Sequence, residues 1–403
     1  MNAPGGRPRA SFAGIGYAEA GARARALVPL LRERAAATEA RGDLLPEVEE
    51  ALHESGLFRI CQPRRWGGME LDFLALCDVP YELARGCAST SWTFGNYAIH
   101  HWMLAMYDER AQEEVWGANP DARIASGIAY PQGRARQVDG GYLVSGTWNF
   151  SSGSPLSDWN MLAALVREGD RVTGYRMCLL HRSEYELLDD WQVLGMRGTG
   201  SQSVRATDVF VPEHRALDTL ACRGGAGFPG ARTNTNPLYQ LPLAVLGAHC
   251  IVATAAGNAQ GALELTCEHV KARTTSYTGA SMRDFQAVQL RTGGAGARIE
   301  AARLLCNAGA ERGMQWAAQG YLPTVEERLA IKRDAAYAVT LSTEAVDLLH
   351  GMAGANGIYD SYPIQRIFRD AHALGAHYQL TFDVHGSAWG LAALGGEVKN
   401  PVL

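Results

Sequence analysis

Two pairs of adjacent polar residues, His100–His101 and Ser151–Ser152, are the first groups that could do chemistry. A histidine exchanges a proton near pH ~6.5, and a serine hydroxyl both donates and accepts a hydrogen bond. Adjacent side chains on a helix point in different directions, so we expect His100 to face a cavity and His101 to lie at a surface or interface. Ser151 and Ser152 alternate across an extended segment, so only one of them can face a given ligand.

Most familiar catalytic and nucleotide-binding motifs are missing. Residues 225–230 fit the string GxGxxG, but no strand leads into it and Pro229 stands where a helix needs a backbone amide. We therefore interpret this stretch as a loop. No P-loop, HExxH pair, GxSxG elbow or EF-hand loop is present, and no metal site is expected.

Composition and charge exclude several classes of protein. The 403 residues are 47% hydrophobic and 20% charged, which is typical of a globular chain. The net charge of −5 and the lack of a basic stripe argue against nucleic acid as a partner. Eight cysteines are scattered singly, which indicates reduced, buried thiols and neither disulfides nor zinc.

Two stretches of the sequence bear on where in the cell the protein is located. The first residues contain arginines but no apolar core with a cleavage site, so we expect no secretory signal and a cytoplasmic protein. The longest apolar run, Leu241–Ala256, could span a membrane. Because it contains His249, we favour a helix buried at the centre of an oligomer and expect no membrane association.

The pattern of apolar residues divides the chain into three regions. Residues 1–120 predict a helical domain, with Asp43 capping one helix and Gly56 ending it. Residues 121–222 predict a compact antiparallel sheet or barrel, because short β-branched runs alternate with turn residues. Residues 223–403 predict a four-helix bundle, with helices over 239–273, 281–319, 325–352 and 364–394.

Three strings in this order resemble the acyl-CoA dehydrogenase superfamily. They are the opening residues 45–68 with their P-x-x-x-G-G loop, the β-strand segment Val204–Pro212, and the turn and helix over residues 351–371. The resemblance implies an α+β fold with an N-terminal helical domain, a middle antiparallel β-domain and a C-terminal four-helix bundle.

The absence of a catalytic carboxylate indicates which branch of that superfamily the chain resembles. Its dehydrogenases use a carboxylate base beyond the last of these strings, but residues 371–378 contain no carboxylate before Asp383. The chain instead resembles the group D flavin monooxygenases, of the p-hydroxyphenylacetate hydroxylase and dibenzothiophene monooxygenase type.

The resemblance implies a set of site residues. His377 matches a histidine on the last long helix that points at flavin and substrate, with His372 as its competitor. Trp92 and His100 match the substrate-side helix. Residues 148–153 match a W-x-F-x-S-G element whose serine lies beside flavin N5. Counting from Trp92 favours Ser151 over Ser152, and Ser126 matches a strand position facing the flavin ring.

The phosphate-binding residues are altered relative to the dehydrogenases. Arg273 and Ser276 occupy the place of their R-x-x-F-G string, where a guanidinium binds the cofactor phosphates. Arg369 is a second candidate, although Arg366 and Asp370 beside it also fit an ordinary ion-pair network.

The resemblance implies an oxygenase component that binds reduced FMN or FADH2 from a separate NAD(P)H:flavin reductase. With O2 it would hydroxylate a small organic substrate, in a site that excludes water, through a flavin C4a-hydroperoxide; the resemblance also implies a homotetramer. Two other functions stay open. One is an acyl-CoA dehydrogenase or oxidase with a displaced base, Glu264 or Glu268, and the other is a non-catalytic helical scaffold.

Overall fold

The computed structural model describes residues 10–219, 224–275 and 278–399. Its N-terminal region is helical. Glycines at positive φ, Gly42 and Gly56, end the first two helices, and Pro46 begins the second. The helices of this region are α1 Tyr17–Arg41, α2 Pro46–Ser55, α3 Ala75–Ala84, α4 Ala88–Leu104 and α5 Glu109–Gln112.

The middle region is a sheet in the order β6-β7-β3-β2-β4-β5-β8, with β1 paired to β4. It is mixed and not purely antiparallel, because β1 and β2 both run parallel to β4. The long connection from β1 through the β2–β3 hairpin lets the chain return in the same direction. The strands are β1 Ile124–Gly127, β2 Gly133–Val138, β3 Gly141–Trp148, β4 Trp159–Glu168, β5 Arg171–His181, β6 Glu186–Leu188, β7 Ser203–Pro212 and β8 Ala216–Asp218.

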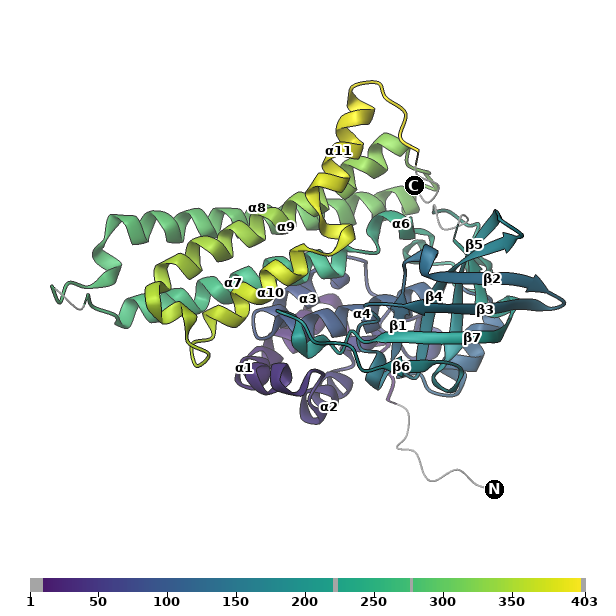
Figure 1. Ribbon diagram of the computed structural model, residues 1–403, viewed down its shortest axis with the longest axis horizontal. Helices are drawn as coiled ribbons and strands as arrows, with labels where there is room; N and C mark the ends of the chain where they lie inside the picture. Colours follow the sequence, from purple (N-terminus) through teal and green to yellow (C-terminus); the bar gives the residue numbers. More distant parts are fainter. Residues whose placement is uncertain (1–9, 220–223, 276–277, 400–403) are drawn as a thin grey trace.

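The C-terminal region is built from long helices that extend away from the sheet (Figure 1). Helices α3 and α4 pack against α7, and α4 also packs against β1. Its helices are α6 Leu243–Leu246, α7 His249–Ala272, α8 Gln286–Ala318, α9 Val325–Ala353, α10 Ile364–Gly375 and α11 Phe382–Ala393. The predicted α+β fold with helical ends and a central sheet is confirmed. The prediction of one continuous helix over 364–394 is wrong, since the chain breaks between α10 and α11.

The helical stretch Leu243–Ala272, which covers α6 and α7, is long and apolar enough to cross a membrane by length and composition alone. Of the most apolar 18 residues in this stretch, 72% are buried inside the protein. Such burial is typical of a helix in a protein core. The seven described cysteines are free thiols, and all are buried except the half-buried Cys267. Cys222 lies outside the described residues.

Helix α4 lies where the three regions meet, and all its residues except Asn96 are buried. Three of its side chains bond backbone atoms of the β-domain. Thr93 donates to Thr199 O (3.4 Å), Tyr97 to Gly153 O (2.6 Å), and His100 Nδ1 lies 2.6 Å from Ile124 O. These contacts fix one face of α4 against the loops of the sheet.

Candidate active site

Trp92, on α4, joins the sheet to the C-terminal bundle. Its indole Nε1–H donates to Ser152 Oγ at 2.9 Å. Its ring meets the His377 ring edge to face, with centroids 5.5 Å apart. Of the residues proposed from the sequence, Trp92, Ser152 and His377 are therefore brought together from three separate regions.

A row of hydrogen-bonded hydroxyl groups continues from Ser152 into the loop before β7. Ser152 Oγ lies 2.8 Å from Ser201 Oγ, which lies 2.7 Å from Thr199 Oγ1. Thr199 in turn donates to Met196 O at 2.8 Å. All three hydroxyl residues are buried, so their side chains form a neutral, hydrogen-bonded network next to Trp92.

The turn before Ser152 explains why the two adjacent serines diverge. Phe150 has a φ of 63°, which is unusual for a residue with a side chain, and its ring is 67% exposed. Ser151 is buried and accepts from Asn160 Nδ2 at 2.9 Å, inside the β-domain. The geometry thus favours Ser152, and not Ser151, as the serine on the Trp92 side.

His100 and His101 are both buried, so the expectation that His101 would lie at a surface is wrong. His101 Nδ1 accepts from Trp116 Nε1 at 2.9 Å, and the two rings stack. Because a carbonyl only accepts, His100 Nδ1 carries a proton toward Ile124 O, which leaves Nε2 as an acceptor. Burial lowers the pKa of His100 to about 4 and that of His101 to about 3.

The resemblance implied that His377 lies on a long helix. In the structure it lies in the break between α10 and α11. It precedes a short 3₁₀ turn, Tyr378–Leu380, and its Nδ1 accepts from the Gln379 backbone N–H at 3.2 Å. The residue is half-buried, and burial lowers the pKa of His377 to about 4. His372 is instead exposed and lies 2.9 Å from Asp347 Oδ1.

The remaining predicted cofactor residues lie elsewhere. Ser126 is half-buried on β1, opposite Met161 of β4. Arg273 follows α7 and donates to Ala353 O at 3.4 Å, and Arg369 donates to Glu39 (2.5 Å) and to Leu194 O (2.8 Å). Ser276 lies outside the described residues. Neither arginine belongs to the Trp92 group.

Sequence reasoning missed four residues of this region: Thr199, Ser201, Gln379 and Lys332. The string Gly198-Thr199-Gly200-Ser201 before β7 was a usable signal, because small residues with hydroxyls often line a ligand site. Gln379 and Lys332 carried no local signal.

The residues around Trp92 fit a flavin ring, which has flat apolar faces and a rim of nitrogen and oxygen atoms. The indole of Trp92 offers a flat apolar surface, and the exposed Phe150, whose ring meets Trp191 edge to face, stands two positions before Ser152 in the sequence. Ser152, Ser201 and His377 offer donors and acceptors for the rim. Within the described residues, no group of three or more His, Cys, Asp or Glu side chains could hold a metal ion.

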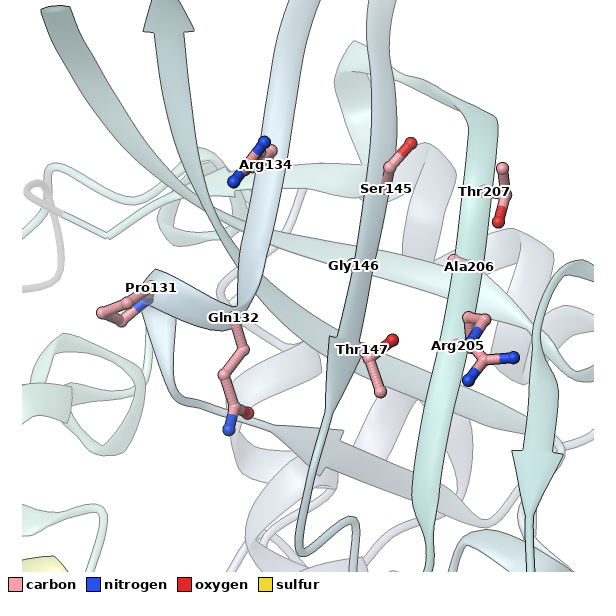
Figure 2. Close-up of a pocket in the computed structure, with 9 residues that line it drawn as sticks. All are labelled: Pro131, Gln132, Arg134, Ser145, Gly146, Thr147, Arg205, Ala206 and Thr207. Carbon is pink, nitrogen blue, oxygen red and sulfur yellow. The ribbon is translucent and has the colours of Figure 1, made fainter. Parts of the chain in front are cut away.

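A separate groove of about 360 Å³ lies on the outer face of the sheet. Figure 2 shows Arg134 of β2, Thr147 of β3 and Arg205 of β7 along it. It is open to solvent, Arg205 already lies 3.6 Å from Glu186, and no residue of the Trp92 group lines it. We therefore place the candidate active site at Trp92.

The two carboxylates considered as displaced bases are both engaged in ion pairs. Glu264 accepts from Arg32 and Arg85, at 2.7 and 2.8 Å, and Glu268 lies 3.7 Å from Arg32. Burial alone would raise the pKa of Glu264, but hydrogen bonds from Gln260 and Arg85 outweigh it and the pKa is lowered. A carboxylate held in this way is a poor base for a carbon acid.

Known proteins resemble this chain over most of its length. The family models for the N-terminal and C-terminal domains of acyl-CoA dehydrogenase match residues 23–118 and 249–382. The oxygenase subunit HsaA of a flavin-dependent monooxygenase from Mycobacterium tuberculosis is 38% identical over 87% of this chain and 89% of its own. Its crystal structure superposes with a TM-score of 0.91, at 34% identity, over 96% of this chain and 100% of that one.

Two further relatives extend the likeness. The oxygenase component of an FADH2-dependent resorcinol hydroxylase from Rhizobium sp. is 36% identical over 87% of this chain and 88% of its own. XiaF from Streptomyces sp., solved with FADH2 and glycerol, is 27% identical with a TM-score of 0.87, over 96% of this chain and 97% of that one.

Proposed function

Because the chain belongs to the acyl-CoA dehydrogenase superfamily and, within it, to the oxygenase components of two-component flavin-dependent monooxygenases, we propose that it hydroxylates a small phenol. In the balanced reaction, the substrate C–H becomes C–OH and the second oxygen atom leaves as water. Reduced flavin, made by a separate reductase, gives up two electrons and two protons and becomes oxidised flavin.

One observation carries this proposal: Trp92 contacts both Ser152 and His377. An indole at this junction gives the site an apolar wall between the sheet and the bundle. Such a wall keeps water from the reacting atoms, and reduced flavin is wasted as hydrogen peroxide where water and loose protons have access.

Each residue then has a stated task toward flavin or substrate. Bound reduced flavin supplies the electrons that activate dioxygen. Ser152 Oγ, held by Trp92 and Ser201, would accept a hydrogen bond from flavin N5–H, with Ser151 as the alternative. His377 would donate a hydrogen bond to an oxygen atom of substrate or dioxygen.

His100 gives the reason for choosing a phenol. Its Nδ1–H is bonded to Ile124 O, so the neutral ring can offer only the lone pair of Nε2 to a ligand. A phenolic O–H is a donor that matches this acceptor. A relative named as a resorcinol hydroxylase is consistent with that substrate class.

We further propose FADH2 as the flavin, a homotetramer as the assembly and the cytoplasm as the location. The relatives named for FADH2, or solved with it, support the flavin. Exposed apolar side chains on α8 and α9, among them Leu290, Leu304 and Tyr337, support self-association through the bundle. Arg273 and Arg369 remain the candidates for binding the cofactor phosphates.

The test is anaerobic mixing of the protein with FADH2 or FMNH2, followed by oxygenated buffer that contains a phenol such as resorcinol. We expect a catechol-type product in near-stoichiometric yield, and oxidised flavin whose appearance lags behind oxygen uptake. Immediate flavin oxidation with hydrogen peroxide as the sole oxygen product, for every phenol tried, contradicts the proposal. Reduction of tightly bound flavin by an acyl-CoA would establish the dehydrogenase instead.

A further inference from the structure

The turn between α10 and α11 holds His377 from both sides through its backbone. The His377 N–H donates to Leu374 O at 3.1 Å, and the His377 carbonyl accepts from Leu380 N at 2.8 Å and from Thr381 Oγ1 at 3.2 Å. The main chain at His377 is therefore fixed, and only the side-chain rotation is left to be set.

The Gln379 backbone sets the proton on the His377 ring. Its N–H points at Nδ1 over 3.2 Å, so Nδ1 must present a lone pair. In a neutral imidazole the proton then sits on Nε2. Protonating Nδ1 would turn this hydrogen bond into a clash of two N–H groups.

Lys332 of α9 lies behind Gln379. Its Nζ donates to Gln379 Oε1 at 3.2 Å, and the side chain is 9% exposed. Within the described residues, no carboxylate lies in salt-bridge distance of Lys332. A buried ammonium that donates to a neutral amide and not to a carboxylate destabilises the fold.

The other titratable groups that sense Lys332 are His249 of α7 and His385 of α11, whose pKa values its charge helps to lower. His249 Nε2 and His385 Nε2 are buried and have no hydrogen-bond partner among the described residues. In the part of the chain that the structure describes, no acidic group forms an ion pair with this ammonium, so its charge disfavours a positive charge on the nearby imidazoles.

We propose that Gln379 and Lys332 are positioning residues for His377: they hold its ring with the proton on Nε2, so that it acts as a neutral hydrogen-bond donor in the reaction. This inference rests on the proposed function, because it takes His377 to face flavin and substrate. It goes further by excluding His377 as the base that deprotonates a phenol, since its Nδ1 lone pair is already used.

The first experiment reads the ring directly and needs no turnover. Solid-state NMR of the full-length protein with ¹⁵N-labelled histidine rings separates the two neutral forms by their nitrogen shifts, and the His377→Asn variant identifies the His377 signals. At neutral pH we expect a protonated Nε2 and an unprotonated Nδ1. A proton on Nδ1 overturns the inference, whatever the activity.

The second experiment tests the link through Gln379. Lys332→Met removes the ammonium, and Gln379→Ala removes the side chain but keeps the backbone N–H. Losing this one hydrogen bond should lower kcat for product about three- to tenfold, with hydrogen peroxide released in its place and KM little changed. Both changes remove the same hydrogen bond, between Lys332 Nζ and Gln379 Oε1. The double variant should therefore lose no more kcat than either single variant.

The exposed Lys399, in the C-terminal tail, provides the matched control, and Lys399→Met should leave product yield and the NMR signals unchanged. Additive losses in the double variant, or unchanged coupling in both single variants, overturn the positioning role. If the NMR form is as expected but no phenol is hydroxylated by the wild-type protein, the proposed function fails and the assignment of the ring stands.

Discussion

The two sides of the candidate site are built in opposite ways. On the sheet side, Trp92, Ser152, Ser201 and Thr199 form a run of neutral groups, each bonded to the next. On the bundle side, the run His377–Gln379–Lys332 ends in a buried ammonium, and its charge acts on two imidazoles whose Nε2 atoms have no hydrogen-bond partner among the described residues. Satisfied neutral networks stabilise a fold, whereas a poorly paired buried charge costs stability and marks a functional site.

The largest effect expected is acid destabilisation, which acts on both sides. Burial lowers the pKa of His100, His249 and His377 to about 4, below the unfolded value near ~6.5. Their stability contribution is complete above pH ~6.5 and is lost as the pH falls toward 4, at about 3 kcal/mol for each ring. Urea unfolding at pH 7, 5.5 and 4.5 measures this loss.

An exposed histidine serves as the control for that measurement. His181 is exposed and caps a short turn, a role that asparagine can keep, so His181→Asn should leave the pH slope unchanged. A stability that stays flat between pH 6.5 and 4.5 would mean that these rings are hydrated and not buried.

The second prediction separates the two sides by the sign of a stability change. Burial lowers the pKa of Lys332 to about 8, so its cost is complete below pH 8 and disappears above the unfolded value near ~10.4. Lys332→Met should therefore raise the free energy of unfolding at pH 7 by about 2–3 kcal/mol, although it lowers activity. Urea unfolding at pH 7 and at pH 10 measures it. A destabilised variant at pH 7 would mean that Lys332 is a well-paired structural residue.

The comparison also shows what the sequence could predict. Although α8 begins at Gln286 and not at the predicted Ser281, the order of the three regions and the bounds of α9 followed from the pattern of apolar residues. The break after Gly375 did not, since residues 376–381 contain neither glycine nor proline. There the His377 side chain caps the short 3₁₀ turn and Thr381 donates to the His377 carbonyl, which are contacts that no periodicity encodes.

The site was predicted in the same uneven way. Trp92 and His377 came from the family resemblance and do contact each other. The direction of each serine depends on Phe150 at φ 63°, a conformation that a phenylalanine gives no reason to expect. Lys332 is far from His377 in sequence and joins it only through the packing of α9 on the turn.

The third prediction concerns catalysis on the bundle side. His377→Asn removes the Nε2–H donor but can still cap the turn, so folding should be preserved. Loss of one well-placed donor lowers kcat about 10²-fold, and reducing equivalents should then leave as hydrogen peroxide. Product and peroxide are counted per FADH2 consumed. Hydroxylation at the wild-type rate without extra peroxide would remove His377 from the mechanism.

The smallest effect decides between the two serines on the sheet side. Ser152→Ala leaves the buried Trp92 Nε1–H without its acceptor, and Ser151→Ala does the same to Asn160 Nδ2, so each should cost about 1–3 kcal/mol of stability. Only Ser152→Ala removes the hydrogen bond that holds the Trp92 indole in the site. Only this variant should therefore bind flavin more weakly and release several times more peroxide. Flavin titration by fluorescence and the peroxide yield are measured for both. If Ser151→Ala is the uncoupled variant, flavin N5 lies on the Asn160 side, and the neutral network around Trp92 is structural support alone.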